Sequence, residues 1–412
     1  MISLPDLPHL VTEPLTMQVT AAAERLIRHG SPWLWQEVIR RQNRPGLAGE
    51  WAVVLDRKQK PLAVGLYDPT TPLRVRLFPA GTPIPPDAAW LAQRLAAANQ
   101  LRLPLTTQPT TGYRIVHGEN DGLPGLVLDR YDQTLVLKLY TSAWIPHLRW
   151  LLPTLATALP YPRLVLRLSA RLSAQPELLF HLQDGLTLWG DKVDDPVAFT
   201  ENGLKLTADV VAGLRTGFYF DQRDNRHLVE TMSAGKSVLV GYAHTGSFSL
   251  AAARGGARQV VSLSASQPAL GMALRHFQLN QEQGTVAAAD HELLVGDVLL
   301  TLNHLHQAHR RFDMVVFTPP PLAPHPADVE RGLDLYGKLC QRGLRLLRPQ
   351  GLVLITSRSG AITADTFYET IHQAADRVWH SLTEIQRTGL PLDHPVTFPS
   401  AAYLKGLLAQ VA

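Results

Sequence analysis

Apolar and polar residues follow two different patterns along the chain. Up to about residue 195, short apolar runs are separated by turn residues, and the run 73–77 alternates apolar with basic side chains. Such alternation is typical of a half-buried strand. From about residue 196, apolar runs of strand length alternate with helical patterns, which predicts a mostly parallel sheet covered on both faces. We therefore expect a small β-barrel, a middle α+β part and a C-terminal α/β domain.

The individual elements follow from the same patterns. In the first segment we expect strands at 50–56, 61–67 and 73–77, a proline-rich linker at 79–86 and a helix over 86–100. In the middle segment we expect strands at 113–116, 125–129, 134–140 and 163–168, and a helix over 143–158. In the last segment we expect strands near 237–242, 258–264, 291–296, 313–317 and 351–357, with helices near 246–255, 267–280, 298–309 and 329–348.

The carboxyl ends of the last set of strands are the places to look for a site, because open parallel sheets bind ligands there. Thr245, Gly246 and Ser247 follow the first strand and open a helix, so their N–H groups can face a carboxylate or another anion. A plain packing turn is the alternative. Asp297 follows the third strand, where it can accept a hydrogen bond from an adenine amine or cap the next helix.

Two further stretches carry candidate chemistry. Thr318 begins a run of three prolines after the fourth strand, where a rigid backbone can support a planar base or simply end the strand. The stretch 217–226 combines aromatic residues with Asp221, Arg223, Asp224 and Arg226. Its aromatic rings can stack on a base, but a helix start with paired surface charges, capped by Asp221, explains the same residues.

Composition excludes several other classes of protein. Apolar residues make up 45% and charged residues 18% of the chain, as in ordinary globular proteins. No run approaches the ~18 apolar residues of a transmembrane helix, and the N-terminus lacks the pattern of a signal peptide. The single cysteine, Cys340, rules out an internal disulfide, and no cluster has metal-ligand spacing. The net charge of +4 is compatible with a polyanionic partner.

Several spaced segments resemble one known family. They are Gly30-Ser-Pro-Trp-Leu34, the runs 49–56, 116–131 and 216–226, and Asp393-His-Pro-Val396 with Tyr403-Leu-Lys405. Together they resemble the bacterial class I S-adenosylmethionine-dependent rRNA methyltransferases with an N-terminal PUA domain, the group that includes the large-subunit rRNA cytosine-C5 methyltransferase.

The resemblance implies a PUA-like RNA-binding domain at 1–80, a central α+β linker domain at 81–195 and a Rossmann-like methyltransferase domain at 196–412. It implies S-adenosylmethionine as cofactor, rRNA as partner and a cytoplasmic location, with a homodimer left open and neither membrane nor metal expected. The implied cofactor residues are Tyr242, Thr245, Gly246, Ser247, Ser264, Asp297, Phe220, Asp221 and Arg223. Thr318, Pro319 and Pro320 are the implied catalytic residues, and Arg74 and Arg76 the RNA-binding ones.

The chain departs from the family pattern at four places. Val240, Ser264 and Thr318 stand where the family usually carries acidic or polar residues, and Arg358 lies in a stretch that is usually cysteine-rich. Loss of two carboxylates would weaken cofactor binding by about 10²–10⁴. Covalent C5 methylation needs a nucleophile such as a thiolate. The residues thus leave open an active RNA methyltransferase, an inactive RNA-binding protein of the same ancestry, and a cleft for another nucleotide.

Overall fold

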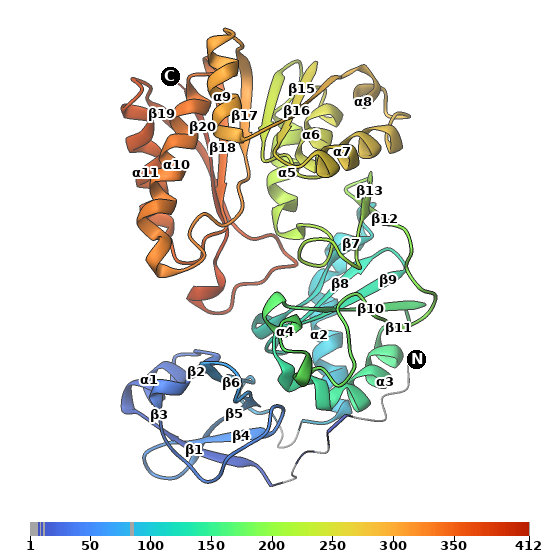
Figure 1. Ribbon diagram of the computed structural model, residues 1–412, viewed down its shortest axis with the longest axis vertical. Helices are drawn as coiled ribbons and strands as arrows, with labels where there is room; N and C mark the ends of the chain where they lie inside the picture. The colour runs from blue at the N-terminus through green and yellow to red at the C-terminus, as the bar shows by residue number, and fades with distance from the viewer. Residues whose placement is uncertain (1–6, 9, 11–12, 83–85, 412) are drawn as a thin grey trace. The chain divides into compact units, whose positions relative to one another are not determined.

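The computed structural model describes residues 7, 8, 10, 13–82 and 86–411, and they form two compact units (Figure 1). Unit 1 takes its residues from 1–203, 207–220 and 392–398, and unit 2 from 204–206, 221–391 and 399–412. Residues 83–85 of the predicted proline-rich linker lie outside the described residues. Each unit is described separately below.

The first part of unit 1 is a six-stranded sheet in the order β2-β6-β5-β4-β1-β3. Its elements are β1 (Leu15–Val19), α1 (Ala21–Arg28), β2 (Trp33–Trp35), β3 (Ile39–Gln42), β4 (Trp51–Leu55), β5 (Pro61–Tyr67) and β6 (Leu73–Leu77). The predicted strands at 50–56, 61–67 and 73–77 are confirmed. In β1 the side chains of Leu15, Met17 and Val19 are buried while those between them are partly exposed, so the period of two sets its inner face.

The second part of unit 1 is a five-stranded sheet in the order β11-β10-β9-β8-β7. Its elements are α2 (Ala88–Thr106), β7 (Gly112–His117), β8 (Leu126–Tyr131), β9 (Thr134–Leu139), α3 (Leu148–Ala158), β10 (Arg163–Leu168), α4 (Ala170–Ser173) and β11 (Thr187–Trp189). The predicted α-helix over 143–158 is correct only from Leu148, because residues 142–147 form a 3₁₀ turn that contains Pro146. Pro146 lacks the N–H that an α-helix would need there.

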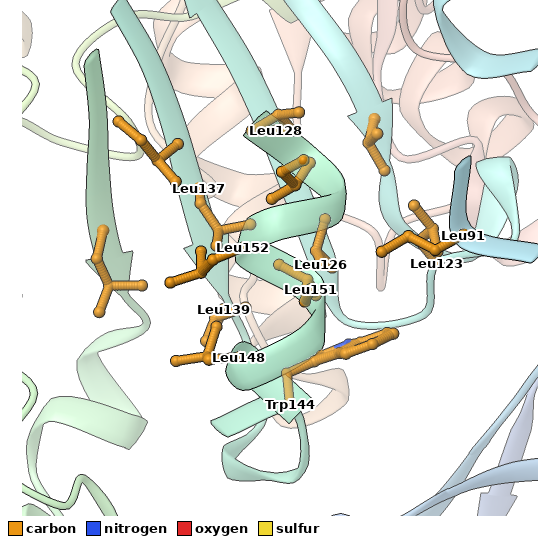
Figure 2. Packing of buried hydrophobic residues seen from close by; sticks show 14 of the residues in the cluster. Leu91, Leu123, Leu126, Leu128, Leu137, Leu139, Trp144, Leu148, Leu151 and Leu152 are labelled. Carbon is orange, nitrogen blue, oxygen red and sulfur yellow. The ribbon is translucent and has the colours of Figure 1, made fainter. Parts of the chain in front are cut away.

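Leucine side chains from the sheet and from α2 and α3 fill the core of this second part (Figure 2). Leu128, Leu137 and Leu139 from the strands face Leu148 and Leu152 from α3 in Figure 2. Each of these five residues is fully buried. Burial of a leucine side chain is worth about 1.5–3 kcal/mol, so this layer of leucines is a major source of the stability of unit 1.

A short segment far along the sequence completes unit 1. The Asp393 carboxylate, which is fully buried, accepts a hydrogen bond from the Arg114 N–H at 2.9 Å. The Arg102 guanidinium donates to the Asp393 carbonyl at 2.9 Å and forms a two-bond ion pair with Asp121 at 2.7 Å. The segment 392–398 is therefore anchored by the buried Asp393, while Leu392 and Val396 remain exposed.

Unit 2 is built on a seven-stranded sheet in the order β16-β15-β14-β17-β18-β20-β19. Its strands are β14 (Ser237–Gly241), β15 (Gln259–Ser264), β16 (Asp290–Val295), β17 (Phe312–Phe317), β18 (Leu347–Ser357), β19 (Leu382–Thr388) and β20 (Lys405–Val411). Its helices are α5 (Arg223–Thr231), α6 (Ser247–Arg254), α7 (Gln267–Leu279), α8 (Gly284–Ala288), α9 (Val298–Gln307), α10 (Val329–Leu344) and α11 (Ala364–Asp376). Where the chain passes between the units it forms β12 (Val197–Glu201) and β13 (Leu204–Ala208).

The order of these strands fixes where a ligand can bind. β14 pairs in parallel with β15 on one side and with β17 on the other, and β18 continues the parallel run. β20 is antiparallel to both β18 and β19. The chain thus proceeds outward in both directions from β14, and such a switch point opens a crevice beyond the carboxyl ends of the strands. The α/β fold expected from the sequence is confirmed.

Candidate active site

The turn after β14 has an unusual backbone. Tyr242, His244 and Gly246 have positive φ angles of 60°, 47° and 73°. A left-handed conformation costs a residue other than glycine about 1–2 kcal/mol, so two such residues in one turn indicate a tightly imposed path. Gly246 precedes α6, and no side chain among the described residues caps this helix end. The first N–H groups of α6 are therefore available to an anionic group.

Close packing fixes this turn in place. A Cβ atom on Gly246 would come within 2.4 Å of the Ala273 Cβ on α7, so no larger residue fits. The fully buried His276, also on α7, donates from Nδ1 to the Thr245 carbonyl at 2.9 Å. Helix α7 thus holds the predicted cofactor residues Thr245 and Gly246 in position through Ala273 and His276.

Ser264 and Asp297 lie at the ends of the next two strands. Ser264 is 7% exposed, and its hydroxyl accepts a hydrogen bond from the Ser266 N–H at 3.2 Å. The exposed Asp297 accepts from the Leu300 N–H at 2.9 Å, which confirms the predicted cap of α9. This bond uses Oδ1. Burial raises the pKa of the Tyr242 hydroxyl, and the charge of Asp297 raises it further, so this phenol stays protonated.

The proline loop after β17 is held at both ends. The Thr318 N–H points to the Gly241 carbonyl at the end of β14, with a long N–O distance of 3.5 Å. Beyond the prolines, the Ala323 N–H donates to the Ser359 hydroxyl at 3.0 Å. Thr318, Pro319 and Pro320 therefore lie between the ends of β14 and β18, at the switch point of the sheet.

Asp221 and Gln222 tie the start of α5 to later parts of unit 2. Asp221 accepts a hydrogen bond from the Tyr403 hydroxyl at 3.0 Å and lies 3.9 Å from the Arg358 guanidinium. Gln222 donates to the Thr356 hydroxyl at 3.2 Å. The N-cap position of α5 is Gln222, whose side chain makes no cap hydrogen bond to the described residues, so the alternative in which Asp221 caps this helix is wrong. Asp221 instead lies one residue before the N-cap and accepts the hydrogen bond from Tyr403, which lies two residues before β20.

Tyr403 and Gln222 were not among the sequence candidates. Tyr403 lies in a segment that carried the family resemblance, but no local pattern links it with a residue 182 positions earlier. Arg223 is buried at the start of α5, beside these residues in sequence. His244 has a lowered pKa because of burial and the positive charge of Arg358, so its imidazole is neutral near pH 7.

Phe220 lies in unit 1, unlike the other predicted cofactor residues. Its ring packs 5.0 Å from that of Tyr131, 5.5 Å from that of Phe218 and 5.7 Å from that of Phe199. The ring is 2% exposed. These contacts give Phe220 a packing role in unit 1, while a contact with the cofactor stays a prediction.

The two predicted RNA-binding arginines already have partners in unit 1. Arg74 donates to the Pro69 carbonyl and to the Gln36 side chain. Arg76 forms an ion pair with Glu119 at 2.6 Å. The side chain of Arg76 is 18% exposed, so a phosphate would have to compete with the Glu119 carboxylate for it.

Comparison with known proteins assigns the chain to a family. Residues 186–410 match the family described as S-adenosylmethionine-dependent methyltransferase, and residues 17–79 match the PUA-like domain. The chain belongs to the S-adenosylmethionine-dependent methyltransferases. This agrees with the resemblance seen in the sequence, and with the fold and cofactor expected from it.

Relatives of this methyltransferase extend over nearly its whole length. A ribosomal RNA large subunit methyltransferase of Deinococcus radiodurans is 42% identical over 96% of this chain and 97% of its own. The ribosomal RNA large subunit methyltransferase I of Photobacterium profundum is 32% identical over 94% and 97%. Two solved structures share its fold, each with 21% identity over 96% of this chain and 100% of theirs: one in complex with SAH (TM-score 0.82) and one from Streptococcus mutans (TM-score 0.81).

In the part of the methyltransferase that the structure describes, every helix is too short or too polar to span a membrane. No group of three or more histidine, cysteine, aspartate or glutamate side chains among the same residues could hold a metal ion.

Proposed function

We propose that this protein transfers the methyl group of S-adenosylmethionine to a base of large-subunit ribosomal RNA. The observation that carries the proposal is the 42% identity, over 96% of the chain, to a relative named as a ribosomal RNA large subunit methyltransferase. The PUA-like match at residues 17–79 supports an RNA substrate, because the resemblance described above implies that a domain of this kind binds RNA.

The polar groups at the carboxyl ends of the parallel strands match the polar groups of the cofactor in charge and hydrogen-bonding capacity. S-adenosylmethionine supplies a methyl group bound to a positively charged sulfur. The uncapped N-terminus of α6 suits the carboxylate of its amino acid part. Asp297 suits the adenine amine, because Oδ1 serves the helix cap and, within the described part of the chain, Oδ2 accepts no hydrogen bond. Ser264 suits one ribose hydroxyl and lacks the second carboxylate oxygen that would accept both.

The remaining residues are assigned by position. Thr318, Pro319 and Pro320 would border the target base, where catalysis comes mainly from holding the acceptor atom in line with the methyl group. Arg74 and Arg76 would bind RNA in exchange for their present partners. We assign the cofactor to Tyr242, Thr245, Gly246, Ser247, Ser264, Asp297, Phe220, Asp221 and Arg223.

We further propose the domain boundaries 1–80, 81–195 and 196–412, with the first domain binding RNA, the second linking and the third transferring the methyl group. We also propose a cytoplasmic location, because a ribosomal RNA substrate is made and assembled into ribosomes there. A homodimer is the oligomeric state to test, by measuring the mass of the protein in solution at several concentrations.

Titration calorimetry with S-adenosylhomocysteine and transfer of a radiolabelled methyl group to unmodified 23S ribosomal RNA test the proposal. The matched variants are Asp297→Asn, which keeps an effective helix cap but not the charge, and Asp297→Ala, which removes both. We expect Asp297→Asn to weaken binding about tenfold with an unchanged melting temperature. Absence of methyl transfer by the natural protein would contradict the proposal.

One observation favours a second candidate function, an RNA-binding protein without catalysis. Val240 is fully buried, and Ser264 and Thr318 are neutral, so carboxylates that the family usually carries are absent. In that case millimolar S-adenosylhomocysteine would not bind, whereas ribosomal RNA would still bind with an affinity that falls as salt rises.

A further inference from the structure

An exposed loop at residues 209–217 of unit 1 follows β13 and carries an apolar side chain into solvent. Leu214 lies in this loop and keeps 60% of its surface exposed. The next residue, Arg215, is also exposed and has a φ angle of 61°. A left-handed backbone costs free energy for a residue other than glycine, so the surrounding structure must impose it. The loop therefore presents a leucine next to an arginine whose backbone is strained.

Two buried cations of the central sheet hold this loop. The Lys138 ammonium, on β9, donates to the Arg215 carbonyl at 2.6 Å. The Arg167 guanidinium, on β10, donates to the carbonyls of Val210 at 3.2 Å and Gly213 at 2.9 Å. Both cations are buried. Because burying a charged group costs free energy, two buried cations bonded to one surface loop indicate that the conformation of this loop matters.

Bonds within the loop and at its end fix the rest of its path. The Gly213 N–H donates to the Asp209 carbonyl at 3.1 Å, and a Cβ atom on Gly213 would lie 2.3 Å from that carbonyl oxygen. The buried Thr216 hydroxyl donates to the Asp129 carboxylate at 2.6 Å. Leu214 therefore stands on a bonded and closely packed backbone, which keeps its side chain at a fixed place on the surface.

An exposed tyrosine lies beside the loop. The centre of the Tyr140 ring is 5.8 Å from the Lys138 ammonium, which in turn bonds to the Arg215 carbonyl. Tyr140 keeps 36% of its surface exposed. Aromatic rings stack on bases, arginine binds phosphate, and an apolar side chain can enter between two bases. The exposed side chains of Tyr140, Leu214 and Arg215 together match an RNA strand whose bases are partly unstacked.

We propose that Leu214 enters the base stack of the RNA substrate and fills the place that the target base leaves. This inference rests on the proposed function. An enzyme that acts on a base inside folded RNA must take that base out of its stack, which leaves a gap. Leu214 fills this gap, Arg215 binds a phosphate of the same strand, and Tyr140 stacks on a neighbouring base. In this role Leu214 contacts the RNA and not the cofactor.

The first test compares a folded with an unfolded substrate. The methylated nucleotide of 23S ribosomal RNA is mapped by mass spectrometry. Two substrates are then made, the folded RNA domain that contains this nucleotide and a short unstructured oligonucleotide of the same local sequence. kcat/KM is measured on both for full-length Leu214→Ala and for Leu103→Ala, which shortens another exposed leucine, on α2. We expect Leu214→Ala to lower kcat/KM about tenfold on the folded RNA and less than about twofold on the oligonucleotide, where no stack opposes extrusion.

Leu103→Ala should match the natural protein on both substrates, and all variants should bind S-adenosylhomocysteine with unchanged affinity. Leu214→Met, which keeps a large apolar side chain, should retain most of the activity on folded RNA. An equal loss on both substrates, a loss of cofactor affinity, or no loss at all in Leu214→Ala overturns the inference and leaves the proposed function standing. Unchanged transfer would assign the exposed leucine to a protein partner instead. Absence of methyl transfer by the natural protein to any RNA overturns the proposed function, and this inference with it.

The second test does not depend on turnover. A fluorescent base analogue replaces the target base in the folded RNA, and its fluorescence rises when it leaves the stack. We expect saturating natural protein with S-adenosylhomocysteine to raise the fluorescence, and saturating Leu214→Ala to give less than about half of that rise. Equal rises with the two proteins, or no rise with the natural one, would refute the insertion of Leu214.

The third test concerns the phosphate contact. The affinity for the folded RNA is measured at several salt concentrations for Arg215→Ala, for Arg215→Lys and for the natural protein. Loss of one phosphate contact should reduce the slope of log affinity against log salt by about one in Arg215→Ala, whereas Arg215→Lys keeps the charge and the slope. The same slope in all three proteins would contradict the role given to Arg215.

Discussion

A carboxylate at residue 264 should strengthen cofactor binding. The Ser264 hydroxyl already accepts the Ser266 N–H at 3.2 Å, so it can accept at most one further hydrogen bond. An aspartate in its place can accept that N–H and both ribose hydroxyls. Exchanging one neutral hydrogen bond of about 1 kcal/mol for two charge-assisted ones of about 1.5–2 kcal/mol each gains about 2–3 kcal/mol.

Part of that gain is lost when the carboxylate is dehydrated, because residue 264 is only 7% exposed. We therefore expect Ser264→Asp to tighten binding of S-adenosylhomocysteine by about 1.4 kcal/mol, a tenfold lower Kd in titration calorimetry. Ser264→Asn tests shape without charge. Ser266→Asp adds the same charge two residues away, where the side chain caps α7. Unchanged or weaker binding by a folded Ser264→Asp, or an equal gain in Ser266→Asp, would refute the reasoning.

Three further predictions concern stability, each measured by urea unfolding. Gly246→Ala should lose about 2–5 kcal/mol, because φ is 73° and the added Cβ would lie 2.4 Å from that of Ala273; its control Gly271→Ala, with open space around the new Cβ, should lose none. Arg102→Leu should lose about 3–5 kcal/mol by leaving Asp121 charged and buried, and adding Asp121→Leu should restore part of it. Burial lowers the pKa of His147 to about 4, so the unfolded state binds a proton that the folded state does not between pH 6.5 and 4. Stability should fall by on the order of 3 kcal/mol over that range as pH decreases, and a His147→Gln variant with the same slope would contradict this cause.

Much of the architecture of unit 2 was readable from the sequence. The central strands β14 and β17 are mostly apolar and buried, because both faces of a parallel sheet are covered. Their predicted positions agree with the structure to within a few residues. The cap formed by Asp297 was also readable, because the residue that caps and the N–H that it accepts are only three positions apart.

Features that depend on distant residues were not readable in the same way. Nothing in the stretch 217–226 shows that Asp221 meets Tyr403, or that Phe220 joins the aromatic cluster of unit 1 with Tyr131 and Phe199. The binding of segment 392–398 in unit 1 rests on buried bonds to Arg102 and Arg114, almost 300 residues earlier. Periodicity describes one element at a time, so it does not report which charges will pair across the fold.

The late arrival of residues 392–398 has a consequence for biosynthesis. Ribosomes add about 5–20 residues each second, so the segment emerges on the order of ten to forty seconds after residue 203. Until then the nascent chain exposes the backbone N–H of Arg114 and one side of the Arg102 guanidinium to water. The N-terminal half of the protein therefore reaches its final state only when translation is nearly finished. During this interval the incomplete unit 1 is the part of the chain that chaperones can protect from misfolding.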